Sequence, residues 1–481
     1  MTKQRINKDQ NEYLRCVDSA FGFEIAKKLT EFKTNDQGFR TAGTPAEKEA
    51  AEWIGQTMQE VGLTGVTIES FDADAWEFHG ATVELTDEAG HTSRLEAGSF
   101  PGLPDFSSED IRGLLVYAAD GTAKAYEGLD VSGKIVLIDT DAYHSWWYGV
   151  LFAQAQARGA RGVIAAVTDH GPGTHKDDLI TIQTVQGFAK IPAVIIDRKD
   201  SMMLRQTLTE SKETITATLH LDVRTGPAKA HYVYGKIEGK NKDNLIIFNG
   251  HYDAFWDGFL DNASSLGSMM TIAKAMIESG YQPDSTILFL TNGAEEYGKK
   301  DSYFDYCTGA TAIVRQHPEW CRQTKACFNF ELTAIDQTEE VTMTVTAGYA
   351  EWFRDLLKQI MPDEEHFVIP TSMAGADNIV LTKAGIPTCM NISTYFDDAS
   401  PAAASGYDHT QYDNADRYDE AAFDRVNQLY GLLAMSVDRM PVIPLDIGVY
   451  LEKYGSDLTT GSVPEKYADI EDLRNTLLRL S

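Results

Sequence analysis

The stretch LIIFNGHYDAFWDGFLDNASSLGSMMTIAKAMIES, residues 245–279, decides the fold of this chain. It opens on the apolar run Leu245 to Phe248, which has the length of a buried strand. A polar segment follows, and residues 262–279 then carry apolar side chains at the spacing of one helix face, at positions 266, 269, 270, 273, 276 and 277. A strand, a polar loop and a helix in this order are typical of α/β proteins.

The same order recurs further along the chain. Short apolar runs lie at Thr286–Leu290, Ala326–Phe330 and Pro387–Ile392, with polar or helical sequence between them. Apolar runs of this length are typical of parallel strands that are buried on both faces. Residues 229–440 are therefore predicted to form an α/β domain in which helices sandwich a mixed, mostly parallel sheet.

Two other segments precede this domain. Residues 1–75 contain a predicted helix over 43–62, capped by Thr44, with Pro45 in its first turn and Gly62 at its end. Residues 76–228 are rich in turns and alternate short apolar runs with helical patterns. This change in the sequence pattern predicts a compact inserted module with its own core.

Residues 441–481, which open on Pro441-Val-Ile-Pro-Leu-Asp, are polar and helical in pattern, and we expect a short C-terminal helical extension.

The composition excludes several classes of function. The chain has 481 residues, with 42 Lys and Arg against 72 Asp and Glu, so its formal net charge is −30. This excess disfavours binding to nucleic acid or to an anionic membrane. The sequence has no long apolar run, no apolar segment in its first twenty residues, and five scattered cysteines without a CxxC pair. These features predict a cytoplasmic protein with neither a membrane span nor a disulfide framework.

Polar residues follow the apolar runs directly. His251 and Asp253 come after the first run, Glu295 and Glu296 after the second, and Glu331 after the third. A loop after the fourth run leads to His409. Ligands of open α/β sheets bind beyond the carboxyl ends of the strands, so we expect these side chains to meet at one edge of the sheet.

Imidazole and carboxylate groups are ligands for zinc where no thiolate is offered, although cobalt or manganese could use the same set. Taken singly, each of these residues is commonly an ordinary surface residue; the joint pattern indicates a metal site. Asp261 is placed to bridge two cations. The pair Glu295 and Glu296 offers one carboxylate for a metal and one for proton transfer.

The motifs resemble the two-zinc aminopeptidase and glutamate carboxypeptidase family. They include Gly250-His-Tyr-Asp253, Asp261-Asn-Ala-Ser264, Ala294-Glu-Glu-Tyr-Gly298, Asn329-Phe-Glu331, Ala384-Gly-Ile-Pro387 and His409-Thr410 with Asp413. Residues 76–228 resemble the protease-associated domain inserted in that family, and Ile443-Pro-Leu-Asp446 resembles the start of its helical dimerisation region. The resemblance implies the zinc exopeptidase fold, a homodimer, and cleavage of a peptide or small amide by a hydroxide that bridges two zinc ions.

Carried over by position, the resemblance implies two zinc ions per chain. His251, Asp261 and Glu331 would hold one ion, and Glu296, His409 and the shared Asp261 would hold the other.

Other residues receive supporting roles from the resemblance. Glu295 would be the general base, Asp253 would orient His251, and Asp377 would support the site. The family also implies a cis peptide between Asp261 and Asn262. Asp408 stands where a tyrosine is usual in the family, so Tyr407, one place earlier, is the candidate for the oxyanion.

Three functions remain open from the sequence. An aminopeptidase would bring the free amine of its substrate to the zinc ions, and the acidic composition favours this reading. A carboxypeptidase or amidohydrolase would hold a free carboxylate, with Arg354 and Arg417 as candidates. A receptor-like binding protein without catalysis is the third, but receptors of this kind lose metal ligands, and every ligand position here is filled.

Overall fold

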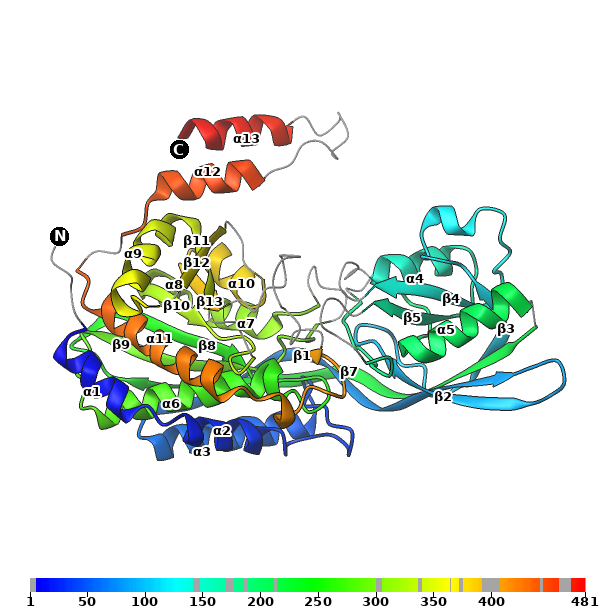
Figure 1. Cartoon of the computed structure of the whole chain (residues 1–481), viewed down its shortest axis with the longest axis horizontal. Helices are drawn as coiled ribbons and strands as arrows, with labels where there is room; N and C mark the ends of the chain where they lie inside the picture. Colours follow the sequence, from blue (N-terminus) through cyan, green and yellow to red (C-terminus); the bar gives the residue numbers. More distant parts are fainter. Residues whose placement is uncertain are drawn as a thin grey trace.

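A computed structural model of the chain describes residues 6–141, 148–169, 176–185, 189–211, 214–299, 305–335, 340–363, 365–371, 375–391, 407–441, 444–457 and 469–480. Two lobes are visible in Figure 1, joined by a long pair of strands. The described residues contain one continuous sheet of thirteen strands, in the order β1-β2-β6-β5-β4-β3-β7-β9-β8-β10-β13-β11-β12. The half from β7 to β12 belongs to the larger lobe, and the half from β1 to β3 extends into the smaller one.

Four parallel strands form the centre of the larger lobe. Strand β8 pairs in parallel with β9 and with β10, and β10 pairs in parallel with β13. Strands β7 and β11 are antiparallel to their neighbours, so the sheet is mixed and mostly parallel in this lobe. The strands span Asn241–His251 (β8), Ser285–Asn292 (β9), Thr324–Asn329 (β10), Glu340–Thr346 (β11), Glu365–Thr371 (β12) and Thr388–Asn391 (β13).

Helices cover both faces of this sheet because alternate strand residues point to opposite sides. Ile246 and Phe248 of β8 pack in one buried cluster with helices α2, α3, α6, α9 and α11. Ile247, between them, packs in another cluster with Ile313 of α7 and Leu381 of α10. The helices of the first face are α2 (Ser19–Leu29), α3 (Pro45–Val61), α6 (Ser264–Glu278), α9 (Ala350–Ile360) and α11 (Glu420–Asp438), and those of the second are α7 (Thr308–Gln316) and α10 (Asn378–Lys383).

The smaller lobe is an α/β module on two long strands. Strands β1 (Thr64–Thr86) and β7 (Thr216–Ile237) pair antiparallel along most of their length and cross both predicted limits of the module. The sequence predicts only a five-residue strand at 66–70 within β1, whereas the strand continues beyond it with alternating apolar and polar residues and a bulge between Phe78 and Gly80. The remaining elements are β2 (Thr92–Ser99), β3 (Ile111–Tyr117), β4 (Ile135–Asp141), α4 (Tyr148–Ala157), β5 (Gly162–Asp169), β6 (Ala193–Ile196) and α5 (Arg198–Gln206).

The ends of the chain are helical. Helix α1 (Lys8–Cys16) packs on the first face of the sheet, and α8 (Pro318–Gln323) precedes β10. Helices α12 (Ile447–Asp457) and α13 (Asp469–Leu480) pack together beside the larger lobe, as Figure 1 shows in orange and red. Among the described residues, no helix has the length and apolar character needed to cross a bilayer.

Candidate metal centre

Asp261 lies between two histidines at the carboxyl ends of the central strands. Its Oδ1 atom is 3.2 Å from Nε2 of His251, and its Oδ2 atom is 3.2 Å from Nε2 of His409. His251 ends strand β8, Asp261 lies in the turn before α6, and His409 lies in the loop before α11. A carboxylate with one oxygen toward each of two imidazoles has the arrangement needed to bridge two cations.

Two glutamates complete the two halves of this cluster. Oε2 of Glu331, just after β10, is 3.3 Å from Nε2 of His251. Oε2 of Glu296, after β9, is 2.9 Å from Nε2 of His409. The five side chains therefore form two overlapping triads, which we name the His251 position (His251, Asp261, Glu331) and the His409 position (His409, Asp261, Glu296).

The hydrogen bonds of the two imidazoles leave the correct nitrogen free for a metal. Nδ1 of His251 lies 3.1 Å from the carbonyl oxygen of Asp253, and Nδ1 of His409 lies 3.1 Å from the carbonyl oxygen of Ile182. A carbonyl oxygen only accepts, so both Nδ1 atoms carry the proton in these contacts. The lone pair of each neutral ring is then on Nε2, which faces the carboxylates.

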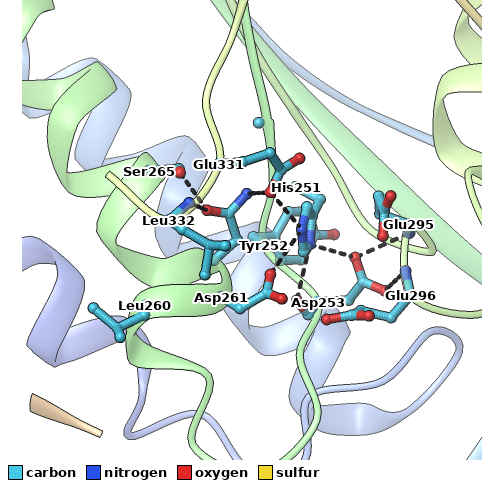
Figure 2. A network of polar contacts seen from close by, with 12 residues as sticks. His251, Tyr252, Asp253, Leu260, Asp261, Ser265, Glu295, Glu296, Glu331 and Leu332 are labelled. Atoms are coloured by element: carbon cyan, nitrogen blue, oxygen red, sulfur yellow. Dashed lines mark hydrogen bonds and ion pairs between the residues drawn. The ribbon is translucent and has the colours of Figure 1, made fainter. Parts of the chain in front are cut away.

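Asp253 holds the glutamate pair as well as His251. Its Oδ1 and Oδ2 atoms accept hydrogen bonds from the backbone N–H groups of Glu295 and Glu296, both at 3.1 Å. The expected orienting contact with His251 comes mainly from the Asp253 carbonyl, because Oδ1 lies farther away, at 3.4 Å from Nδ1. Figure 2 shows Asp253 between the histidine and the two glutamates.

The turn that carries Asp261 is fixed by two further residues. Asp413 accepts hydrogen bonds from the backbone N–H groups of Leu260 at 2.6 Å and Asp261 at 3.0 Å. Asn262 donates from Nδ2 to Oε2 of Glu331 at 2.7 Å (Figure 2). The peptide between Asp261 and Asn262 is cis, which confirms the expectation.

Glu295 lies beside the cluster with a separate set of neighbours. Its Oε1 atom accepts a hydrogen bond from the thiol of Cys307 at 3.3 Å, and Asp377 lies in the same buried group. Burial raises the pKa values of Glu295, Cys307 and Asp377, with the effect on Glu295 and Cys307 the larger. Glu295 is thus a buried carboxyl with a raised pKa next to the two triads, which is the environment of a group that exchanges protons.

The charge balance of the cluster fits bound cations. Burial raises the pKa of Glu296 to about 6, although His409 opposes the shift, and raises that of Glu331 to about 7 against the effect of His251. Burial also disfavours the charged form of Asp261, but the two histidines outweigh it and hold its pKa below the usual value. Oε1 of Glu296 is buried without a hydrogen-bond partner. Buried carboxylates of this density need positive charge, and nitrogen and oxygen donors in triads are suited to zinc.

The other predicted residues lie apart from the two triads. Tyr407 is buried, and the guanidinium of Arg417 lies 3.8 Å from the centre of its ring. Arg354 of α9 donates to the carbonyl oxygen of Val368 in β12 at 3.2 Å, so its guanidinium is engaged in a hydrogen bond between these two elements. His317 stacks on Trp320, and His366 contacts the carbonyl oxygen of Met361, as expected of structural histidines. His144 lies outside the described residues.

Sequence reasoning missed the groups that support the cluster from a distance. Thr184 of the inserted module donates to the carbonyl oxygen of Glu296 at 2.7 Å, and Ile182 contacts His409. Asp413 is present in the quoted motif, but its bonds to the Asp261 turn depend on the folded loop. Cys307 follows Glu295 by twelve residues and has no pattern of its own in the sequence.

The fold and the cluster together define an α/β protein with a buried group of His, Asp and Glu side chains at the carboxyl edge of its sheet. The family model "Peptidase family M28" matches residues 232–434, and the model "PA domain" matches residues 111–204. These matches confirm the resemblance to the zinc exopeptidases that carry an inserted PA domain, and the predicted fold class is confirmed with them.

Individual proteins agree with this assignment. An aminopeptidase of Pseudomonas aeruginosa (strain UCBPP-PA14) is 22% identical over 336 residues, which cover 66% of this chain and 58% of that protein. The chain thus spans less than two thirds of this relative. The solved structure of a peptidase M28 precursor from Shewanella amazonensis SB2B has a TM-score of 0.73 at 19% identity and covers 91% of this chain and 97% of its own. BSAP, a zinc aminopeptidase from Bacillus subtilis, has a TM-score of 0.67 at 21% identity and covers 89% and 98%.

Proposed function

We propose that this protein is a two-zinc aminopeptidase that hydrolyses the first peptide bond of a peptide, or the amide of a peptide-like substrate. The observation that carries the proposal is Asp261, whose two oxygens face His251 and His409 at 3.2 Å each. The family assignment and the likeness to aminopeptidases support the same conclusion.

The residues of the two triads would hold the metals. His251 and Glu331 would bind one zinc ion, His409 and Glu296 the other, and Asp261 both. Bound zinc would supply a Lewis acid for the substrate carbonyl and would lower the pKa of water. The carbonyl oxygens of Asp253 and Ile182 keep a proton on Nδ1 of each ring and so direct Nε2 to the metals. Burial opposes the charged rings, but Glu331 and Glu296 outweigh it and raise the pKa values of His251 and His409, so metal binding would displace a proton from each Nε2.

Glu295 is the proposed general base and acid. It lies beside the triads and contributes to neither, so its carboxylate is free to take a proton from the attacking water. The same carboxyl would then give the proton to the leaving amine. The raised pKa of Glu295, caused by burial, makes its carboxylate a stronger base and so favours the first step, and the hydrogen bond from Cys307 holds Oε1 in place.

The acidic surroundings favour a substrate with a free amine. The chain carries a formal net charge of −30, which attracts an ammonium group and repels a terminal carboxylate. Of the two arginines suggested for a carboxylate substrate, Arg354 is bonded within α9 and β12. The charge therefore supports cleavage from the amino end.

A mixed pool of peptides analysed by mass spectrometry tests the proposal. We expect zinc-loaded protein to shorten peptides one residue at a time from the amino end, with a chelator abolishing the reaction. Acetylated copies of the same peptides are the control and should stay intact. Ladders that shorten from the carboxyl end would replace the proposal with a carboxypeptidase, and equal cleavage of acetylated peptides would remove the role of the amine.

A homodimer through the C-terminal helices is also proposed. Ile447 of α12 and Leu473 and Leu480 of α13 are exposed apolar side chains, at 55%, 49% and 66% of their full areas. Light scattering should give twice the chain mass of 53.2 kDa, and a monomer at micromolar concentration would reject this proposal.

A further inference from the structure

Part of the inserted module lies against the loop that carries His409. We name residues 176–185 the docking segment and residues 407–413 the His409 loop. Ile182 donates its N–H to the carbonyl oxygen of His409 at 3.0 Å, and Nδ1 of His409 lies 3.1 Å from the carbonyl oxygen of Ile182. Each residue thus contacts the backbone carbonyl oxygen of the other. The second of these contacts, from Nδ1 of His409 to the carbonyl oxygen of Ile182, orients the imidazole ring of His409.

Side chains of the His409 loop reinforce the contact. Oε1 of Gln411 accepts from the N–H of Ile180 at 3.0 Å, and its Nε2 donates to the carbonyl oxygen of Asp178 at 2.5 Å. The hydroxyl of Tyr412 donates to Oδ2 of Asp178 at 2.7 Å. These bonds extend the contact from the Ile182–His409 pair toward Asp178 on the docking segment and Tyr412 on the loop.

The backbone of His409 requires such support. Its φ angle is +58°, a left-handed conformation that is unfavourable for a residue other than glycine. The carbonyl oxygen of His409 also accepts a hydrogen bond from Nε1 of Trp256 at 3.1 Å, and Phe255 meets the imidazole edge-on. Phe255 and Trp256 follow β8 in the larger lobe and pack in the same buried cluster as residues of the inserted module. His409 is therefore held by the docking segment together with these two residues of the larger lobe.

The docking segment also holds the second ligand of the same position. The hydroxyl of Thr184 donates to the carbonyl oxygen of Glu296 at 2.7 Å, and this hydroxyl is buried. By contrast, the ligands of the His251 position are hydrogen-bonded within the larger lobe: His251 donates to the carbonyl oxygen of Asp253, and Glu331 accepts from Asn262. Among the described hydrogen bonds of the ligands, those to the docking segment are therefore found at the His409 position and not at the His251 position.

We propose that the docking segment is a positioning element of the His409 position and sets the affinity of that position for its metal. Thr184 and the carbonyl of Ile182 act through Glu296 and His409, and the inserted module becomes a required part of one metal site and not of the other. The inference rests on the proposed two-metal function, but it concerns metal affinity and is measured without catalysis.

Zinc titration of the full chain against a chromophoric chelator tests the inference. In wild-type protein we expect two zinc ions with separable affinities. Thr184→Val keeps the size of the side chain and removes the donor, and should weaken one site by about tenfold, the lower end of the range for a group that supports a metal ligand. The other site should keep its affinity. Thr184→Ser, which keeps the hydroxyl, should restore wild-type binding.

A second threonine of the inserted module is the matched control. The hydroxyl of Thr140 is buried and donates to the carbonyl oxygen of Ala166 at 3.2 Å, away from the His409 loop. Thr140→Val should bind both zinc ions as wild type does. Three results would overturn the inference. They are an equal loss of zinc affinity in both variants, a loss of affinity at both sites in Thr184→Val, and unchanged affinity in Thr184→Val.

A partly exposed residue provides an independent variant if Thr184→Val does not fold by circular dichroism. Gln411→Met removes both hydrogen bonds between that side chain and the docking segment and should weaken the same single site by about fivefold, the factor for one typical hydrogen bond. Unchanged affinities in folded Gln411→Met would overturn the inference. Two wild-type zinc sites without peptide cleavage would contradict the proposed function and leave this inference intact.

Discussion

The carboxylate of Asp253 accepts a hydrogen bond from the backbone N–H of Glu295 at 3.1 Å. Its other oxygen binds the next N–H along the chain, so one buried side chain after β8 fixes the start of the glutamate pair after β9. Glu295, the proposed general base, is thereby positioned by the same segment that delivers His251. This link between two neighbouring strands predicts a role for Asp253 that is separable from metal binding.

Asp253→Asn should lower kcat more than it lowers metal content. The amide can accept only one of the two N–H groups and presents a donor to the other. We expect kcat to fall by about 10- to 100-fold, the range for loss of a supporting partner in a metal site. Steady-state kinetics and elemental analysis of the same samples measure both quantities. Asp257→Asn on the same loop is the control, and an equal loss of activity there would contradict the assignment.

Glu331→Gln should empty the His251 position first. The substitution preserves size and removes the negative charge that faces Nε2 of His251 at 3.3 Å. Zinc titration should show one site weakened by about 100-fold or more, since a ligand is lost, while the His409 position keeps its metal. Glu319→Gln, at an exposed glutamate of α8, provides the comparison. Two unchanged sites in Glu331→Gln would show that this side chain is not a ligand.

Zinc should stabilise the fold and its removal should destabilise it. The buried carboxylates of the two triads repel one another unless cations neutralise them. A ligand at one hundred times its Kd adds about 2.7 kcal/mol to the free energy of unfolding. Differential scanning fluorimetry should therefore give a higher Tm with zinc than with a chelator. Magnesium at the same concentration is the control, because it prefers an all-oxygen shell; equal Tm values with zinc and chelator would argue against a metal site.

Arg40 should be important for stability because it is buried and bonded to backbone carbonyls. Its Nε donates to the carbonyl oxygen of Tyr252 at 2.5 Å, and its Nη1 to that of Leu29 at 3.0 Å. Arg40→Met leaves both carbonyls without these donors, and we expect a loss of about 2–4 kcal/mol in the free energy of unfolding. Urea unfolding measures it, with the exposed Arg15→Met as the control. A loss below 1 kcal/mol would show that the Arg40 hydrogen bonds add little.

The clustering of three of the five side chains could be predicted because each of the three follows an apolar strand. His251, Glu296 and Glu331 lie within a few residues of a strand end, and parallel pairing brings those ends to one edge of the sheet. Asp261 is found by its spacing within the quoted stretch. The central strands and helix α6 were predicted for the same reason: their apolar periodicity is strong.

The supporting contacts could not be predicted in the same way. The bonds of Thr184 to Glu296 and of Ile182 to His409 join residues more than one hundred positions apart, and they depend on how the inserted module packs. The length of β1 was missed although Trp76, Phe78, Val83 and Leu85 in its outer half are buried, because a bulge between Phe78 and Gly80 breaks the two-residue alternation there. The orienting contact to His251 was assigned to the Asp253 side chain, whereas the nearer acceptor is its backbone carbonyl, which a sequence motif does not distinguish.

The most direct test of the proposed mechanism is the activity and zinc content of Glu295→Gln. The variant keeps the shape of the side chain and removes its ability to take a proton, while both triads remain complete. We predict two bound zinc ions per chain, as in wild type, together with a fall in kcat of at least about 100-fold on an unblocked peptide. Activity within tenfold of wild type, at full zinc content, would contradict the role of Glu295 as the general base.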